Sequence, residues 1–223
     1  MMNSAEIKSP MRCPLCGSAD NVFFFEDKSR TYLRCPECAL IFVPPEFHVS
    51  AEEEKERYEE HNNDYNDAGY RRFLERITDP VGAKFSKGAE GLDFGCGPTP
   101  LLAGILNEMG FDMEVFDPFY AANRAVLETE YDFVVTTEVV EHLAAPLETL
   151  KKMFSLIRPD GMLAVMTRPF DESIDFKGWH YKNDCTHICF FCLEAFDWIS
   201  EEMNIPYRRV ENDIFVFDRQ HVS

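Results

Sequence analysis

Four cysteines near the N-terminus have the spacing of a zinc-binding site. They form two C-x-x-C pairs, Cys13 with Cys16 and Cys35 with Cys38, separated by 18 residues. Each pair can point two thiolates at one ion, and tetrahedral Zn²⁺ accepts four sulfur ligands without leaving an open position. Because we expect the thiols to stay reduced, disulfides explain the pattern less well. The spacing therefore predicts a structural zinc ribbon, a unit too small to fold without its metal.

A glycine-rich turn between a strand and a helix forms a second candidate site. The segment Leu92-Asp93-Phe94-Gly95-Cys96-Gly97-Pro98 follows an apolar strand pattern and precedes an amphipathic helix. Its glycines let the backbone approach a ligand at the C-terminal end of the strand. About twenty residues further on, Asp117 ends the next predicted strand, where a carboxylate can bind ribose hydroxyls. Together these features predict a nucleotide-type cofactor site.

Acidic and histidine side chains follow the predicted strand 131–136. Glu138, Glu141 and His142 fall on one turn beyond the end of that strand, where open α/β sheets bind ligands. His187 lies far along the chain in an aromatic-rich segment. Carboxylates and imidazoles that converge here can bind a metal ion or act as a general base.

Strands and helices that alternate from about residue 89 must position these groups, and this alternation is typical of a parallel sheet. The pattern predicts strands at 91–94, 112–117, 131–136 and 162–167, helices near 101–109, 147–157 and 193–203, and closing antiparallel strands at 207–211 and 214–218. Upstream it predicts a short hairpin, followed by one or two helices within 51–79. We therefore expect three parts: a zinc ribbon (1–50), a helical linker or lid (51–88) and an α/β domain (89–223).

The composition limits the classes of protein to which the chain can belong. Of its 223 residues, 45% are hydrophobic, enough to bury a sizeable core. Lys and Arg number 22 against 40 Asp and Glu, and a net charge of −18 disfavours binding to nucleic acids through their phosphate backbones. No apolar run approaches the roughly 20 residues that span a bilayer, and the N-terminus lacks the apolar core of a secretory signal. We expect a soluble, cytoplasmic protein without a membrane partner.

Residues 89–218 resemble the class I S-adenosylmethionine-dependent methyltransferases. The D-x-G-x-G turn resembles the first motif of that family, Asp117 its ribose-binding acid, 131–135 its fourth strand, and 157–163 its lead-in to the fifth strand. The resemblance implies an α/β, Rossmann-like sheet of seven strands, the last inserted antiparallel, and S-adenosyl-L-methionine as methyl donor. The cofactor contacts that we predict are Asp93, Phe94, Gly95, Cys96, Gly97, Asp117 and Thr137.

Two features depart from the pattern of that family. Thr99 replaces the third glycine of the turn, and only 13 residues separate Asp117 from Tyr131, too few for a full helix and a third strand. We expect an abbreviated adenine pocket in which Ala125-Val126-Leu127 stands in for the third strand. An NAD-dependent oxidoreductase would share a nucleotide-binding turn, but such turns read G-x-G-x-x-G, and nothing after Thr136 supplies a nicotinamide site.

The E-x-x-E-H turn has a resemblance of its own. With a later histidine, it resembles the metal site of small-RNA 3′-terminal 2′-O-methyltransferases, and a similar turn occurs in the ubiquinone-pathway O-methyltransferases. This implies that Glu138, Glu141, His142 and His187 hold Mg²⁺ or Mn²⁺, which binds an acceptor hydroxyl and lowers its pKa. We assign catalysis to Glu141, His142 and His187. Two alternatives stay open: a histidine acts as a general base without metal, or these side chains are structural.

The predicted function is methyl transfer to a small-molecule hydroxyl or activated carbon. Ribbon-bearing bacterial natural-product and deoxysugar methyltransferases are similar in organisation. The first alternative is an RNA methyltransferase, yet residues 1–50 hold five basic and six acidic residues and lack the basic face of an RNA-reading ribbon. The second is a binding protein with a degenerate methyltransferase fold. The sequence does not predict the acceptor, the methylated atom (O, C or N) or the oligomeric state.

A native mass spectrum of protein purified without chelator tests these assignments together. We expect one zinc ion and retained S-adenosylmethionine or S-adenosylhomocysteine. A further Mg²⁺ or Mn²⁺ that is lost in Glu141→Ala would favour the metal-assisted mechanism. Zinc without cofactor, even with cofactor in excess, would contradict the methyltransferase assignment.

Overall fold

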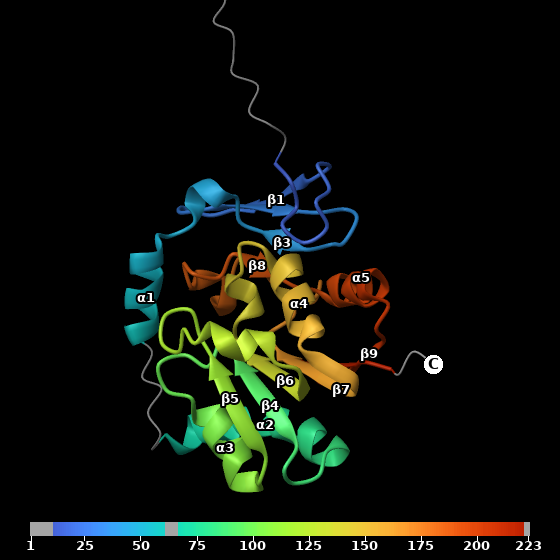
Figure 1. Cartoon of the computed structure of the whole chain (residues 1–223). Helices are drawn as coiled ribbons and strands as arrows, with labels where there is room; N and C mark the ends of the chain where they lie inside the picture. Colours follow the sequence, from blue (N-terminus) through green and yellow to red (C-terminus); the bar gives the residue numbers. More distant parts are fainter. Residues whose placement is uncertain (1–10, 61–66, 221–223) are drawn as a thin grey trace, which may run out of the picture.

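Two β-sheets and the helices around them make up the computed structural model, which describes residues 11–60 and 67–220 (Figure 1). The strands are β1 (Val22–Glu26), β2 (Thr31–Arg34), β3 (Ile41–Phe42), β4 (Glu90–Phe94), β5 (Asp112–Phe116), β6 (Tyr131–Thr137), β7 (Ile157–Met166), β8 (Cys189–Phe190), β9 (Tyr207–Glu211) and β10 (Ile214–Asp218). The α-helices are α1 (Ala51–Glu60), α2 (Ala68–Lys84), α3 (Leu101–Met109), α4 (Pro146–Ser155) and α5 (Leu193–Met203). The 3₁₀ helices are η1 (Pro45–Phe47), η2 (Arg124–Glu128), η3 (Val140–His142) and η4 (His180–Asn183).

The small sheet has the strand order β1-β2-β3-β8. Its predicted hairpin is confirmed: β1 and β2 pair antiparallel, and the Asp27 carboxylate closes their turn by accepting from the backbone N–H groups of Ser29 and Arg30. The fourth strand comes from the other end of the sequence, because β8 pairs antiparallel with β3. Residues 11–50, here called the cysteine-rich unit, therefore share a sheet with the second half of the chain.

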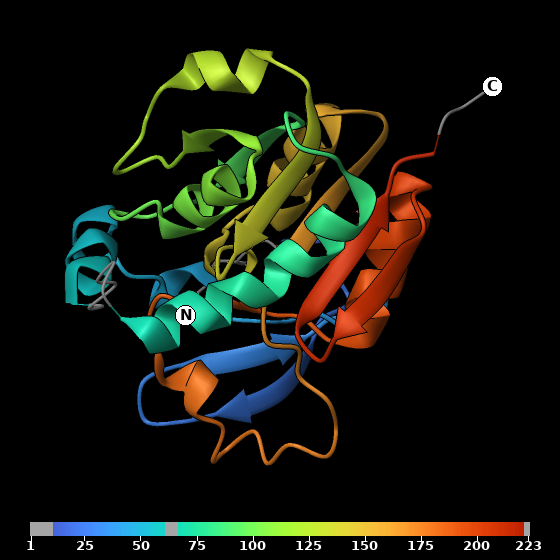
Figure 2. The ribbon, with the colours of Figure 1, turned by 90° about the horizontal axis from the view of Figure 1, so that it is seen from below.

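The large sheet has the strand order β5-β4-β6-β7-β10-β9. Strands β4 to β7 are parallel, and β10 enters antiparallel between β7 and β9, as the sequence predicts. Successive side chains of β6 alternate between the faces: Phe133 and Val135 pack in the core with α2 and α3, and Val134 packs in the core with α4 and the small sheet. Figure 2 shows α2 crossing the first of these faces.

The expected seventh strand is not present in this sheet, which has six strands among the described residues. Residues 125–127 lie in the 3₁₀ helix η2 and not in a strand, because the connection from β5 to β6 is too short for a crossover helix and another strand. Strand β5 is consequently the edge, and a cavity of about 530 Å³ lies between it and η2. The lead-in expected at 157–163 is itself part of β7, in which residues 159–161 form an irregularity with Asp160 at a positive φ of 65°.

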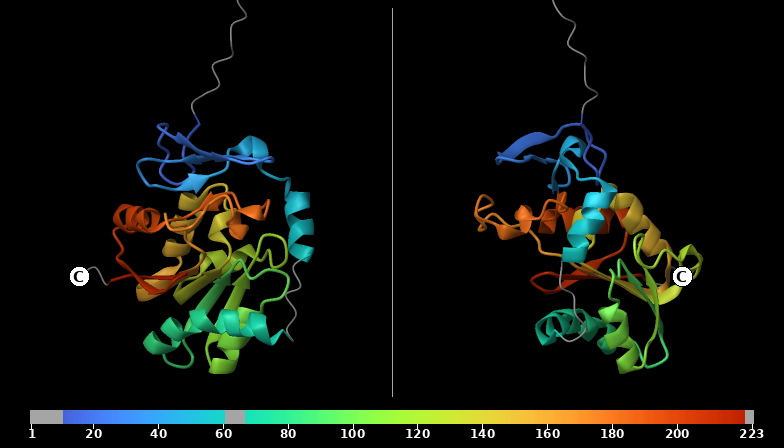
Figure 3. Two further views of the ribbon diagram at one scale, coloured as in Figure 1. Left: turned by 180° about the vertical axis from the view of Figure 1, so that it is seen from behind. Right: turned by 90° about the vertical axis from the view of Figure 1, so that its left-hand side faces the viewer.

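Helices α1 and α2 confirm the expected helical stretch after residue 50, although residues 61–66 lie outside the described residues. Helix α1 spans the side of the molecule between the cysteine-rich unit and the large sheet (Figure 3). Among the described residues, no helix combines the length and apolar character that crossing a bilayer requires. The domain limits at 50 and 88 stay predictions.

Two phenylalanines of the small sheet test its role in stability. Phe190 is fully buried against the rings of Tyr32, Phe176 and Trp179, whereas Phe23 on the outer strand is 65% exposed. We expect Phe190→Ala to lower the free energy of unfolding by about 3–5 kcal/mol because it leaves a cavity. The matched control Phe23→Ala should change it by about 0.5 kcal/mol or less. Urea unfolding measures both, and equal losses would contradict this account of the packing.

Candidate active site and metal centres

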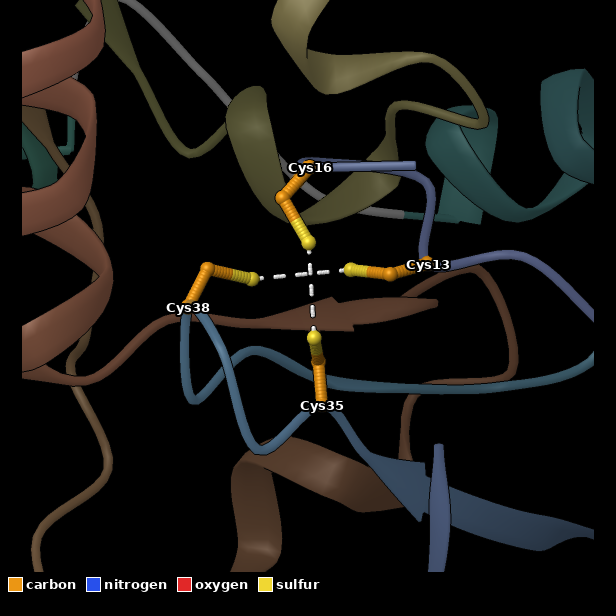
Figure 4. A group of neighbouring side chains, drawn as sticks. All are labelled: Cys13, Cys16, Cys35 and Cys38. Carbon is orange, nitrogen blue, oxygen red and sulfur yellow. Dashed lines mark hydrogen bonds between the residues drawn. The ribbon is translucent and has the colours of Figure 1, made fainter. Parts of the chain in front are cut away.

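The four N-terminal cysteines come together as the sequence predicts. Their thiol groups point toward one another from two turns (Figure 4), with 3.5 Å between the Sγ atoms of Cys13 and Cys38 and 3.4 Å between those of Cys16 and Cys35. A tetrahedral ion with Zn–S bonds of about 2.3 Å keeps its sulfurs about 3.8 Å apart. The hydrogen bond from Cys38 lowers the pKa of Cys13, so this thiol readily becomes a thiolate. The donor set and its size fit Zn²⁺.

The glycine turn after β4 has the conformation that its sequence requires. Gly95 and Gly97 have positive φ angles of 82° and 65°, which side chains rarely adopt. A Cβ at Gly95 would collide with Val139, whereas a Cβ at Gly97 would meet no atom within 4 Å. The N–H of Gly95 donates to the carbonyl of Phe116, which ties the turn to the end of β5. Gly97 is therefore the point at which a ligand can approach the backbone.

Two buried acids lie at this turn. Burial chiefly, with Asp117 nearby, raises the pKa of Asp93 to about 7. The Asp117 carboxylate accepts hydrogen bonds from the backbone N–H groups of Gly97 at 3.1 Å, Phe119 at 2.8 Å and Tyr120 at 3.0 Å. An ionised carboxylate has about four acceptor positions, so Asp117 shapes the turn and can still accept one hydroxyl.

The side chains of the remaining predicted cofactor contacts differ in whether they already have a partner within the protein. The Oγ1 atom of Thr137, at the end of β6, is buried and has no hydrogen-bond partner among the described residues. A bound ligand is one explanation for such an orphaned polar atom. Phe94 packs its ring against Phe116, and the Cys96 thiol donates to the Gly97 carbonyl, so both side chains are already engaged. Their contact with a cofactor stays a prediction.

Glu141 is the buried centre of the predicted catalytic cluster. Its side chain is fully buried and accepts hydrogen bonds from Thr167 Oγ1 at 3.0 Å and from the Tyr181 hydroxyl. Burial, with Glu141 close by, raises the pKa of Tyr181 well above its usual value, so this hydroxyl keeps the proton that it donates. Glu141, His142 and His187 offer ligand atoms within 4.8 Å of one another. Three of the four predicted ligands are thus brought together.

The two histidines are oriented by backbone carbonyls. His142 Nδ1 lies 3.1 Å from the Thr186 carbonyl, and His187 Nδ1 lies 2.8 Å from the Tyr181 carbonyl. Because a carbonyl only accepts, each Nδ1 carries a proton, and in a neutral ring the lone pair then lies at Nε2. Burial lowers the pKa of His142 to about 4, which keeps the ring neutral. A neutral Nε2 can bind a metal ion or accept a proton.

Glu138 is the predicted ligand that the structure does not place in this group. It has a left-handed φ of 52°, a strained conformation for a residue with a side chain. Burial, with Glu141 nearby, raises its pKa to about 9, so the side chain carries a proton at neutral pH. Glu138 lies beside Glu141 and Tyr181, and its role as a metal ligand stays a prediction.

A family model described as "Methyltransferase domain" matches residues 63–206. The chain belongs to this methyltransferase family. The prediction of an S-adenosylmethionine-dependent methyltransferase is thereby confirmed as to the class of enzyme. A comparison with curated proteins found no match.

Several solved structures are similar to this methyltransferase. One is the 1,6-didemethyltoxoflavin-N1-methyltransferase of Burkholderia thailandensis, with bound 1,6-didemethyltoxoflavin and S-adenosylhomocysteine: 14% identity, TM-score 0.54, covering 89% of this chain and 99% of that one. Another is TnmH, at 14% identity and TM-score 0.50, covering 69% of this chain. An O-methyltransferase family protein from B. thailandensis is 13% identical, with TM-score 0.48 over 71% of this chain. The methyltransferase spans only 57% of TnmH and 62% of the O-methyltransferase family protein.

Two tyrosines of the methyltransferase's helices were missed as site residues. Tyr58 of α1 places its ring 5.3 Å from that of His142 and 6.1 Å from that of Phe119, between the cofactor turn and the acidic cluster. Tyr70 of α2 lies near Asp93, and burial chiefly raises its pKa to about 12. Both tyrosines fit a helical periodicity, which indicates a buried face but not what that face covers.

Removing one hydroxyl tests the buried network of the methyltransferase. Tyr181→Phe takes away one of the two side chains that donate to Glu141, so we expect a loss of about 1–3 kcal/mol in the free energy of unfolding. The control Tyr207→Phe removes a hydrogen bond to Asp197 at the surface and should cost less than about 1 kcal/mol. Urea titrations of both variants give the comparison, and a control as damaging as Tyr181→Phe would refute it.

Proposed function

We propose that this methyltransferase transfers a methyl group from S-adenosyl-L-methionine to a small-molecule acceptor. The observation that carries the proposal is one of placement: the turn at Gly97, the acid Asp117 and the unpartnered Thr137 hydroxyl all lie at the carboxyl ends of β4, β5 and β6. In open α/β sheets this edge binds ligands. The similar fold of an N1-methyltransferase with bound S-adenosylhomocysteine supports the same cofactor here.

The residues of the turn fit that cofactor. Asp117 can accept from a ribose hydroxyl, Gly97 admits the ligand to the backbone, and Thr137 offers a hydroxyl that needs a partner. When bound, S-adenosylmethionine supplies a methyl group on a positively charged sulfur, open to in-line attack by a nucleophile. The acidic side chain of Asp117 lies at this edge, which suits a cationic ligand.

The neighbouring cluster activates the acceptor. In the neutral form, His142 and His187 each present a lone pair at Nε2, since Nδ1 faces a carbonyl, and Glu141 accepts two hydrogen bonds. One carboxylate and two imidazoles form a donor set that suits Mn²⁺ better than Mg²⁺, which prefers oxygen ligands. Without a metal, the same Nε2 atoms can accept the proton of an acceptor hydroxyl. Tyr58, beside His142, borders the space in which donor and acceptor meet.

The cysteine-rich unit completes the proposal as a zinc ribbon. Zn²⁺ held by Cys13, Cys16, Cys35 and Cys38 would tie together the two turns that carry these cysteines. Helix α1, within the predicted 51–88 linker, serves as the lid, since Tyr58 reaches the cluster. A zinc site made of four thiolates would suit the predicted cytoplasmic location, where thiols stay reduced.

The negative charge of the chain limits the class of acceptor. With 40 acidic and 22 basic residues, the chain repels phosphate backbones, so RNA is disfavoured as acceptor. A degenerate fold that only binds ligands is opposed by the intact turn and the fixed histidines.

Cofactor binding to Gly97→Ala tests the proposal most directly. We expect the affinity for S-adenosylhomocysteine, measured by calorimetry, to fall at least about tenfold because the new Cβ fills the approach to the turn. Gly88→Ala is the matched control: its φ of 85° imposes similar backbone strain, and its Cβ also meets nothing within 4 Å. That variant should bind like wild type.

Two measurements on the wild-type protein distinguish the proposal from its alternatives. Absence of S-adenosylhomocysteine binding would overturn the proposal and favour a degenerate fold. Transfer of label from S-adenosylmethionine to cellular RNA, with none to the small-molecule fraction, would favour the RNA alternative.

A further inference from the structure

A buried arginine of the cysteine-rich unit is bonded to the loop that carries His187. Arg30 lies in the β1–β2 turn and is 7% exposed. Its Nη1 atom donates to the carbonyls of Cys185 at 3.0 Å and His187 at 2.9 Å, and its Nη2 atom donates to those of Lys182 and, at 3.0 Å, Asp184. All four terminal N–H groups of the guanidinium are thus used on one loop (182–187). Figure 2 shows the β1–β2 hairpin beside this segment.

The turn itself is fixed, so the guanidinium acts from a defined position. The Asp27 carboxylate accepts from the Arg30 backbone N–H at 3.0 Å, from the Tyr32 hydroxyl at 3.0 Å and from Lys182 Nζ at 3.1 Å. The last contact adds a second link between the turn and the loop. The Arg30 guanidinium also lies over the Tyr32 ring, 5.4 Å from its centroid. The turn therefore contacts the loop through a planar group whose four terminal N–H donors all have acceptors.

Backbone carbonyls of this loop and of the adjoining Tyr181 in turn accept hydrogen bonds from both histidines. The Thr186 carbonyl faces His142 Nδ1, and the Tyr181 carbonyl faces His187 Nδ1. The carbonyls bound by Arg30 are their direct neighbours along the chain: that of Lys182 follows Tyr181, and those of Cys185 and His187 flank Thr186. If the loop turned, the two imidazoles would lose the acceptors that fix their protons at Nδ1.

Only a guanidinium can make these contacts. Its planar fork holds five N–H donors in fixed directions, whereas a lysine ammonium carries three donors at one point. A lysine at position 30 would keep the positive charge but could not span four carbonyls.

We propose that Arg30 is a positioning residue of the active site, which acts through the 182–187 loop to hold His142 and His187 in the Nδ1-protonated form. The proposal rests on the proposed function in one respect only, namely that the two Nε2 lone pairs serve the reaction. It makes the cysteine-rich unit a part of the active site and not an appended module.

Histidine side-chain ¹⁵N spectra of the full-length, zinc-loaded protein test the proposal without an acceptor. At about pH 8 an ordinary imidazole is neutral, and the spectra distinguish a protonated Nδ1 from a protonated Nε2. His142→Gln and His187→Gln assign the signals. In wild type we expect protonated Nδ1 and unprotonated Nε2 at both residues. In Arg30→Lys and Arg30→Met we expect the two ring-nitrogen shifts of His187 to move toward each other, as both tautomers become populated.

The matched control is Arg34→Met on strand β2. Arg34 belongs to the same unit but pairs with Glu172, so its loss should leave both tautomers unchanged. As a second readout, we expect Mn²⁺ affinity to fall about 10–100-fold in the Arg30 variants, the usual effect of losing a group that orients a ligand.

The outcomes separate this proposal from the proposed function. Unchanged tautomers in both Arg30 variants would overturn the positioning role. Loss of zinc from Arg30→Lys would also overturn it, since the guanidinium would then serve the cysteine-rich unit itself. A wild type with the expected tautomers that binds neither Mn²⁺ nor S-adenosylhomocysteine would contradict the proposed function, while the tautomer shift would still support the role of Arg30.

Discussion

The side chain of Glu141 is fully buried, and the surrounding structure depends on this. A carboxylate that is removed from water must receive hydrogen bonds from the protein instead. Thr167, just after β7, supplies one donor, and Tyr181 in the following loop supplies the other. Tyr181 reaches Glu141 only if the loop folds back over η3. The Ile188 backbone N–H also donates to the Glu141 carbonyl, which leads the chain directly into β8. The hydrogen bonds that Glu141 needs therefore also fix the fold of this loop and the entry of the chain into β8.

The cofactor side and the acceptor side of the proposed site are built in different ways. The cofactor turn is local: glycine conformations, backbone N–H groups and one carboxylate shape it within about 25 residues of chain. The acceptor side is assembled from η3, the 182–187 loop, α1 and the β1–β2 turn, which lie far apart in the sequence. Of the acceptor-side elements, η3 and the 182–187 loop lie within the residues that the family model matches, whereas α1 and the β1–β2 turn lie before them.

This difference explains what the sequence could predict. The C-x-x-C pairs and the D-x-G-x-G turn depend on short-range geometry, so Cys13, Gly97 and Asp117 were found from spacing. Glu138 was grouped with Glu141 by spacing and does lie beside it, but its burial and raised pKa depend on tertiary contacts that spacing does not show. Arg30 gave no signal, since its partners are carbonyls some 150 residues away that any sequence provides. The prediction of a short third strand at 125–127 was also wrong. The thirteen residues between Asp117 and Tyr131 form a 3₁₀ helix there, and their composition did not distinguish it from a short strand.

The pairing of β3 with β8 also has a consequence for biosynthesis. The small sheet begins near the N-terminus, but its last strand is synthesised roughly 150 residues later, on the order of ten seconds or more at ribosomal speed. During that interval the edge of β3 is uncovered and Arg30 has no carbonyls to bind. The four cysteines, by contrast, are all available early. Metal capture on the ribosome can therefore hold the first strands in a defined shape until the rest of the chain arrives to cover them.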